Sequence, residues 1–261
     1  MSPKIPLSSI AAGGVSGTDT GVAGGGSDNI VLQASGLEKT YRSWLPWSPS
    51  VEVLSGTGLT VRAGELVGIV GGNGSGKSTL MKILVGVLDQ DAGEVERGGT
   101  IGWCPQETLL YDRLTVRETF RLFGEGYGLS TAEIEGRVDW LADRLDFGTY
   151  LDTRIDRLSG GNRQKVNLSI ALLHEPDVLL LDEPYTGFDW ETYQAFWGMA
   201  DDLAAQGTAV VLISHLLEEH HRLDRLYELR DGRLEESDPV ATVAQADANG
   251  ERTTEPSGEG P

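Results

Sequence analysis

Hydrophobic positions in the chain form short apolar runs that alternate with longer stretches of helical periodicity. The runs at residues 65–70 (ELVGIV), 100–105 (TIGWCP), 177–182 (DVLLLD) and 208–214 (TAVVLIS) predict buried strands by their length and composition. Between them, helical patterns cover residues 78–88, about 160–173 and 190–206. Strands that alternate with helices in this way predict an α/β fold with a largely parallel central sheet.

One region interrupts this alternation. Residues 115–128 (TVRETFRLFGEGYG) and 131–146 (TAEIEGRVDWLADRLD) are two successive amphipathic helical patterns with no strand between them. They predict a helical insert, or subdomain, at about residues 106–159. No internal repeat is evident along the chain.

The two ends of the chain have a different composition from its middle. Residues 1–28 are rich in Gly, Ser and Ala, and residues 237–261 are small, polar and acidic. Segments with so little apolar content cannot bury enough surface to fold, so both are expected to be flexible tails. The ordered domain is therefore expected at residues 29–236.

The charge balance is strongly acidic. The formal net charge is −19, from 40 acidic and 21 basic residues. Such an excess disfavours nucleic acid as a partner and direct adhesion to anionic lipid, because both need clustered Lys and Arg. Few lysines among many carboxylates favour a halophilic source, since a Debye length of about 3 Å in molar salt removes most self-repulsion. An ordinary acidic protein is the alternative.

Cysteine content and hydropathy limit the class of protein further. The single cysteine, Cys104, excludes an internal disulfide and a Cys-rich metal site, and fits a reducing cytoplasm. Its place in a predicted strand suggests a small buried apolar residue. No apolar run reaches the ~20 residues of a membrane span, and no signal-like segment opens the chain. We therefore expect no membrane anchor within this chain.

A phosphate-binding loop is the clearest chemical motif. Residues 71–78 (GGNGSGKS) fit the P-loop consensus G-x-x-x-x-G-K-[ST] between a predicted strand and a predicted helix. In such a loop, backbone N–H groups surround the phosphates, Lys77 supplies positive charge, and the Ser78 hydroxyl is placed to bind Mg²⁺. The alternative, a glycine-rich turn before a helix, does not require the Lys-Ser pair.

Polar residues follow two of the predicted buried strands. Asp182 and Glu183 end the strand at 177–182, and His215 follows the strand at 208–214. In α/β sheets the carboxyl ends of strands bind ligands, so Asp182 is expected to orient Mg²⁺ and Glu183 to act on an attacking water. His215 is expected to contact a phosphate. A solvated acidic turn and a structural histidine are the alternatives.

A second candidate anion site lies far along the chain. Residues 158–164 (LSGGNRQ) place Ser159 and two glycines at the start of a predicted helix. Ser159 can cap that helix, and the glycines expose backbone N–H groups to an anion. A single domain with two phosphate-binding elements requires an explanation.

Together these motifs resemble the nucleotide-binding subunit of an ABC transporter. Residues 37–41 (LEKTY), 71–79, Gln106 in CPQE, LSGGNRQ, LLLDEP, TGFD and ISH match the family's aromatic loop, Walker A, Q-loop, signature, Walker B, D-loop and switch histidine in order. The fold that the resemblance implies is a P-loop NTPase core with a parallel central sheet, an N-terminal antiparallel β region and a helical subdomain. Gly72, Tyr185 and Phe188 depart from the commonest residues, but none of these changes removes a catalytic group.

The resemblance implies a role for each matched position. Glu183, His215 and Gln106 would be catalytic, and Tyr41 would stack on adenine. Mg²⁺ would be held by Ser78, Gln106 and Asp182. The remaining implied ATP contacts are Gly71, Asn73, Gly74, Ser75, Gly76, Lys77, Ser78, Thr79, Ser159, Gly160, Gly161 and Asp189. Trp44 and Trp47 could cover the adenine, but packing in a hairpin is the preferred interpretation.

The resemblance also explains the second anion site. In this family two ATPase subunits, identical or different, pair head to tail, and the signature of each serves the ATP of the other. The subunit would bind a membrane permease at the cytoplasmic face of the membrane through residues 106–159. The segments around residues 111–138 and 171–193 are most similar to exporter-type ATPases that pair with a separate permease. An importer ATPase and a non-transport ABC ATPase are the alternatives.

Overall fold

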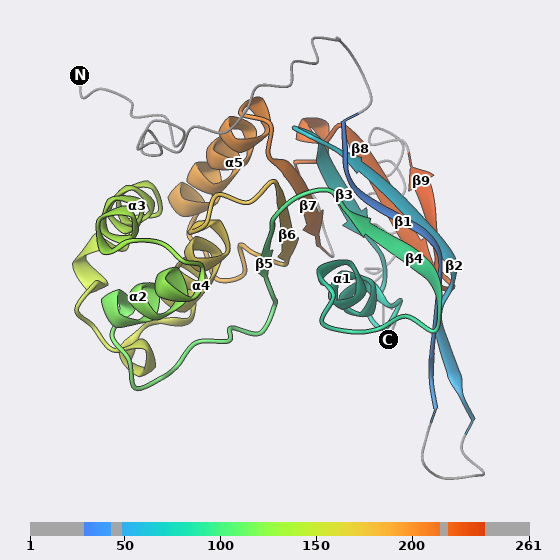
Figure 1. Cartoon of the computed structure of the whole chain (residues 1–261), viewed down its shortest axis with the longest axis horizontal. Coiled ribbons are helices and arrows are strands. Elements are labelled where there is room, and N and C mark those ends of the chain that lie inside the picture. The colour runs from blue at the N-terminus through green and yellow to red at the C-terminus, as the bar shows by residue number, and fades with distance from the viewer. Residues whose placement is uncertain (1–28, 43–48, 215–218, 238–261) are drawn as a thin grey trace, which may run out of the picture.

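The structure, a computed structural model, describes residues 29–42, 49–214 and 219–237. Its main element is a six-stranded sheet in the order β5-β6-β7-β3-β8-β9 (Figure 1). The first five strands run parallel, and β9 pairs antiparallel with β8. This confirms the predicted parallel central sheet. The strands are β3 (Leu66–Val70), β5 (Ile101–Cys104), β6 (Val178–Asp182), β7 (Ala209–Ile213), β8 (Arg225–Arg230) and β9 (Arg233–Ser237).

A second, antiparallel sheet has the order β2-β1-β4. It consists of β1 (Ile30–Tyr41), β2 (Val51–Arg62) and β4 (Ala92–Arg97). This sheet confirms the predicted antiparallel region near the N-terminus. The segment that joins β1 to β2 contains Trp44 and Trp47, which lie outside the described residues.

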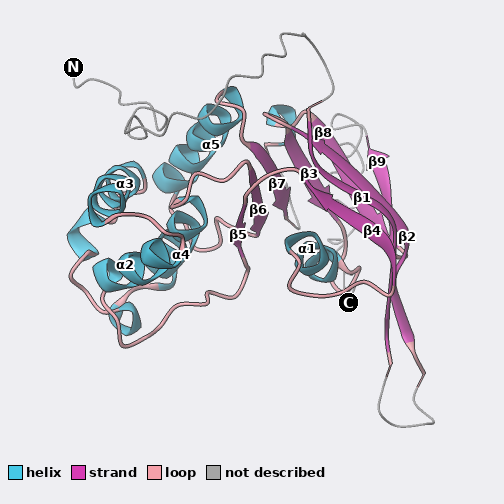
Figure 2. Cartoon of the chain, viewed as in Figure 1, coloured by secondary structure: helices cyan, strands magenta, loops and turns pink. Residues whose placement is uncertain are grey.

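Helices cover both faces of the six-stranded sheet. Helix α1 (Lys77–Val85) lies between the two sheets, whereas α4 (Gly160–Leu172) and α5 (Trp190–Ala205) lie on the other face (Figure 2). Alternate residues of β6 divide between the two cores: Leu180 packs with α1, and Leu181 packs with α4 and α5. Because both faces of β6 are buried in this way, its sequence is a continuous apolar run.

The predicted helices of the insert are present, and they pack beside α4. Helices α2 (Val116–Gly126) and α3 (Thr131–Arg144) each begin with a capping box, formed by Thr115 with Glu118 and by Ser130 with Glu133. These reciprocal bonds satisfy the free N–H groups at each helix start. The apolar faces of both helices pack into the core that α4 and α5 share with the sheet.

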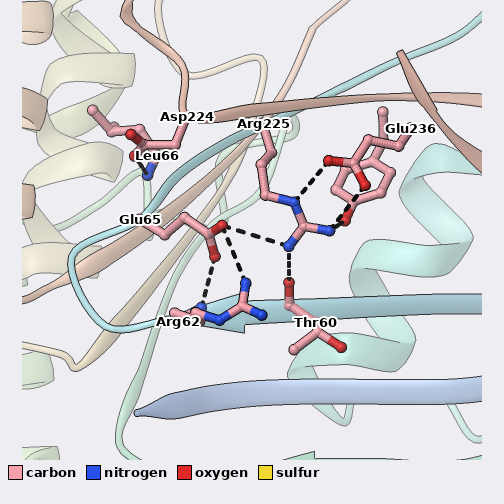
Figure 3. Close-up of polar contacts among 8 residues, drawn as sticks. Thr60, Arg62, Glu65, Leu66, Asp224, Arg225 and Glu236 are labelled. Carbon is pink, nitrogen blue, oxygen red and sulfur yellow. Dashed lines mark hydrogen bonds and ion pairs between the residues drawn. The ribbon is translucent and has the colours of Figure 1, made fainter. Parts of the chain in front are cut away.

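Figure 3 shows a polar network that joins the two sheets around Arg225. Arg225 pairs with Val67 near the start of β3, whereas the P-loop follows the end of that strand, so the network lies at the opposite end of the sheet. The Arg225 guanidinium donates to the carbonyl of Thr60 in β2 at 2.9 Å and to both carboxylate oxygens of Glu236 in β9 at 3.1 and 3.2 Å. It also contacts the Tyr227 hydroxyl and lies 3.5 Å from Glu65. Bidentate Arg–carboxylate pairs are strong and directional, so this network fixes β2 against β8 and β9.

Within the described residues, no helix is both long and apolar enough to cross a membrane. The predicted tails, residues 1–28 and most of residues 237–261, lie outside the described part of the chain.

Candidate nucleotide site

The site forms where three neighbouring strands end. β6, β7 and β3 are adjacent and parallel, so their carboxyl ends share one edge of the sheet. This edge carries the P-loop after Val70, Asp182 with Glu183 after β6, and Ser214 after β7. His215, the next residue, lies outside the described part of the chain, so its expected phosphate contact stays a prediction.

The P-loop leaves the start of α1 open to an anion. Gly76 occupies the N-cap position with φ 105°, and no side chain caps the helix. A β-carbon on Gly76 would lie 2.7 Å from Val53 Cγ1, so only glycine fits this close approach. Exposed N–H groups and the positive end of the helix dipole therefore point toward the loop.

Lys77 closes the loop. Its Nζ donates to the carbonyl oxygens of Gly71 and Gly72 at 2.7 and 2.9 Å. Burial lowers the pKa of Lys77, whereas the charges of Glu183 and Asp182 oppose that shift. The structure thus brings this ammonium group within electrostatic reach of both carboxylates that the sequence analysis selected.

The loop also contains a buried hydroxyl that the rest of the described chain does not satisfy. Ser75 Oγ is shielded from solvent and has no hydrogen-bond partner among the described residues. A buried hydroxyl without a partner is costly. A phosphate oxygen in the loop would accept a hydrogen bond from this hydroxyl, so the residues present fit a nucleotide phosphate.

Asp182 and Glu183 lie together at the end of β6. Asp182 is only 6 % exposed, and Glu183 donates its N–H to the Ile213 carbonyl at 3.0 Å. Glu183 has a φ of 50°, which costs a non-glycine residue about 1–3 kcal/mol and is typical of functional sites. The backbone thus turns sharply at the residue expected to act on water.

Gln106 reaches the same carboxylate from the start of the helical subdomain. Its Nε2 donates to Glu183 Oε2 at 3.3 Å. For Mg²⁺, the predicted ligands Ser78, Gln106 and Asp182 supply hydroxyl, amide and carboxylate oxygens, the ligands this ion prefers. No cluster of three His, Cys, Asp or Glu side chains suited to a metal occurs in the described residues, so a site here depends on that mixed set.

Tyr41 lies beside the P-loop helix. It is the last residue of β1, the residue is 46 % exposed, and its hydroxyl is 3.3 Å from Thr79 Oγ1. An exposed aromatic ring next to the phosphate loop is suited to stacking on a base. The stacking of Tyr41 on adenine stays a prediction.

The signature motif lies apart from this edge. Ser159 caps α4 by accepting the N–H of Asn162 at 3.3 Å, and α4 lies on the face of the sheet opposite α1 (Figure 1). Gly161 packs so closely on Gly187 that an added β-carbon would lie 2.5 Å from its carbonyl oxygen. Ser159 and Gly160 remain exposed, so a partner can approach them.

Asp189 has a structural contact besides its expected role. Its side chain caps α5 by accepting the N–H of Thr192 at 2.8 Å, and this bond lowers the pKa of Asp189. Its expected contact with a nucleotide stays a prediction.

Two contacts near the site were not anticipated. The Tyr185 hydroxyl donates to Ser214 Oγ at 2.7 Å, which links the segment after β6 to the end of β7. The Asn167 side chain donates to the carbonyl of Pro105, next to Gln106, at 3.0 Å. Tyr185 could have been selected because it departs from the family pattern, whereas no sequence signal distinguishes Asn167.

Fold and site together define a P-loop nucleotide-binding protein in which Asp182 and Glu183 lie within electrostatic reach of the loop lysine. The ABC transporter family model matches residues 54–186, which is about half of the chain. The chain therefore belongs to the ABC transporter family, as its ATP-binding component.

Known relatives agree with this assignment. An uncharacterized ABC transporter ATP-binding protein of Methanocaldococcus jannaschii is 35 % identical over 183 residues, 70 % of either chain. Nod factor export ATP-binding protein I of Rhizobium sp. (strain N33) is 33 % identical over 230 residues, 83 % of this chain and 73 % of the relative.

Solved structures share the fold. The structure of an ATP-binding subunit of an ABC transporter superposes with a TM-score of 0.72 at 27 % identity, over 84 % of this chain and 95 % of that chain. A dimeric bacterial ABC transporter cassette superposes with a TM-score of 0.73 at 24 % identity, over 80 % of this chain and 98 % of that one. These superpositions confirm the expected fold, and the family assignment confirms an ATPase.

Proposed function

We propose that two ATPase subunits of this kind bind ATP between them and use its hydrolysis to drive a membrane permease that exports a substrate. The observation that carries the proposal is the placement of the two phosphate-binding elements on opposite faces of one sheet. Helix α1 packs against the three-stranded sheet, and α4 packs with the helical subdomain. A signature on the opposite face is suited to a nucleotide held by another subunit.

The dimer has direct support from a structural neighbour, which is a dimeric cassette. A pair of identical subunits related by a two-fold axis would hold two equivalent sites. Each ATP would contact the P-loop of one chain and Ser159, Gly160 and Gly161 of the other. A second, different ATPase subunit would satisfy the same geometry.

Each residue of the site has a defined task in this proposal. Lys77 and the loop N–H groups hold the phosphates, and Ser78, Gln106 and Asp182 would hold Mg²⁺, which would neutralise charge on the phosphates. Glu183 accepts a proton from the attacking water, His215 contacts the γ-phosphate, and Tyr41 stacks on adenine. Asp189 reaches the nucleotide across the dimer.

Export is favoured over import by the relatives, because several of them are Nod factor export proteins. The permease would bind the segment after Gln106, where Leu109 and Tyr111 expose 62 % and 59 % of their surface. These two neighbouring side chains supply apolar surface that a protein partner would bury. The chain would then lie at the cytoplasmic face of the membrane, held there by the permease.

The experiment is to identify a membrane permease encoded by a neighbouring gene, co-express it with this chain, and measure transport in oriented vesicles. We expect ATP-driven movement away from the ATPase side, and loss of co-purification when Leu109→Asp and Tyr111→Asp are combined. Val87→Asp is the matched control, because Val87 is equally exposed but follows α1. We expect the neighbouring gene to encode a permease with six membrane spans. A neighbouring gene for a substrate-binding protein, together with inward transport, would contradict export.

The acidic surface supports a further part of the proposal, namely that the protein works at high salt. With a net charge of −19, self-repulsion at low ionic strength opposes the compact state. Thermal unfolding at low and at molar KCl tests this. We expect the melting temperature to rise with salt, and an unchanged value would contradict a halophilic protein.

A further inference from the structure

Helix α4 carries more than the signature motif at its start. Two of its amide side chains, Gln164 and Asn167, are 4 % and 5 % exposed and face the end of β5. Asn167 Nδ2 lies 3.2 Å from Cys104 Sγ and 3.0 Å from the Pro105 carbonyl oxygen, and Gln164 Nε2 lies 3.7 Å from the same sulfur. A buried amide must find partners, and an amide nitrogen has two hydrogens to donate.

The bond to Pro105 acts directly on Gln106. The carbonyl group of Pro105 and the N–H of Gln106 belong to one planar peptide unit. Holding the oxygen therefore fixes the orientation of the backbone from which the Gln106 side chain departs. From that position the side chain reaches Glu183 at 3.3 Å.

We propose that Asn167 is a positioning residue, which transmits the placement of the signature helix to Gln106 and through it to Glu183. The proposal rests on the catalytic role of Gln106 in the proposed function. Ser159, at the start of α4, faces the nucleotide of the other subunit, whereas Asn167, two turns later, holds the glutamine of its own site. One rigid helix thus connects the two sites of a dimer.

Neighbouring polar residues of α4 provide a comparison. Ser169 is fully buried, but its hydroxyl donates at 2.8 Å to the Lys165 carbonyl within the same helix. Ser169 therefore contributes to α4 without a hydrogen bond to the segment 104–106. Ser169→Ala is the matched control for a buried polar change that leaves Gln106 in place.

The first experiment compares steady-state hydrolysis and ATP affinity of Asn167→Leu, which keeps the branching and heavy-atom count of the side chain but removes the donor. We expect kcat to fall about tenfold with ATP affinity changed less than about twofold, while Ser169→Ala stays near wild type. In a Gln106→Ala background, Asn167→Leu should cause no further loss, because both act through one group. The proposal would be overturned if the two substitutions lowered kcat independently, so that their effects multiplied in the double variant. An unchanged kcat in Asn167→Leu would also overturn it.

The second experiment needs no hydrolysis. Cys104 is the single cysteine, and burial raises the pKa of its thiol, so its labelling by a thiol reagent reports opening of this segment. We expect labelling about fivefold faster in Asn167→Leu than in wild type or Ser169→Ala. Equal labelling would overturn the proposal. Wild-type kcat in Gln106→Ala would instead contradict the catalytic role of Gln106, and faster labelling would still support the positioning contact.

Discussion

Gln106 and Glu183 are 77 residues apart in the chain, yet the side-chain amide of one donates to the carboxylate of the other at 3.3 Å. The bond connects the entry to the helical subdomain with the end of β6. The backbone of Glu183 is held as well, since its N–H bonds to the Ile213 carbonyl. With both its backbone and its carboxylate bonded, Glu183 would be pre-oriented for a water molecule, as its proposed role as general base requires.

Glu183→Gln should leave ATP binding intact and slow hydrolysis by about 10²-fold or more, within the range that a general base supplies. The amide has the same shape but does not accept the proton from water. An ATP-bound dimer should therefore accumulate, and size-exclusion chromatography with ATP will detect it. Wild-type turnover in this variant would show that another group is the base.

Lys77→Ala should abolish tight ATP binding, because the loop holds the Lys77 ammonium group at the carbonyls of Gly71 and Gly72, where we propose that it meets the β- and γ-phosphates. Titration with a fluorescent ATP analogue measures the affinity. Lys82→Ala on the same helix is the control, since Lys82 is exposed on its surface. Equal affinity in the Lys77 variant and the control would remove Lys77 from the site.

Tyr41→Ala should weaken ATP binding by about 1–3 kcal/mol, the range found for bases stacked on aromatic side chains. Tyr41→Phe keeps the ring and loses only the contact with Thr79, so its effect should be smaller. Both affinities follow from the same titration. If the two variants bind ATP as tightly as wild type, the adenine lies elsewhere, with Trp44 or Trp47 as the next candidates.

Acid should release the network around Arg225. The hydrogen bond from Arg225 lowers the pKa of Glu236 below its ordinary value of 4.5. A lowered pKa in the folded state means that the stabilising contribution is complete above pH 4.5 and is lost as the pH falls through the folded value. Glu236→Gln should therefore lower the melting temperature at neutral pH.

The difference in melting temperature between Glu236→Gln and wild type should shrink as the pH falls below 4.5. Thermal melts from neutral to acidic pH measure it. A constant difference across this range would show that the carboxylate charge contributes nothing.

The elements that the sequence predicted well are those with a regular apolar pattern. The run at 65–70 became β3, and the patterns before and after residue 130 became α2 and α3. The helix predicted at 78–88 ends earlier, at Val85, because Gly86 adopts a left-handed conformation with φ 89°.

Other elements lacked such a pattern. Strand β4 is largely exposed, and four of the six side chains of β8 are charged or aromatic, so neither shows an apolar run. The candidate site residues could be selected from the sequence because phosphate-binding loops require fixed residue types at fixed spacing. The contacts of Tyr185 with Ser214 and of Asn167 with Pro105 were not, since they depend on which strands and helices become neighbours.

The central claim is that each nucleotide is shared between two chains, and mixed dimers of two variants test it. One chain carries Lys77→Ala and the other Ser159→Arg. Ser159 is exposed, so the arginine should spare the fold apart from about 1 kcal/mol for the lost helix cap, but block an approaching nucleotide. Each homodimer should be inactive, and ATP-dependent association of the mixed pair should exceed that of either variant alone.

The decisive measurement is the number of vanadate-trapped labelled nucleotides per mixed dimer. If sites are shared, one site collects both lesions, and the other combines an intact Lys77 with an intact Ser159. Close to one nucleotide should therefore be trapped per mixed dimer. If each chain served its own ATP, every site would carry one lesion, and the absence of trapping in mixed dimers shown to associate would contradict the account.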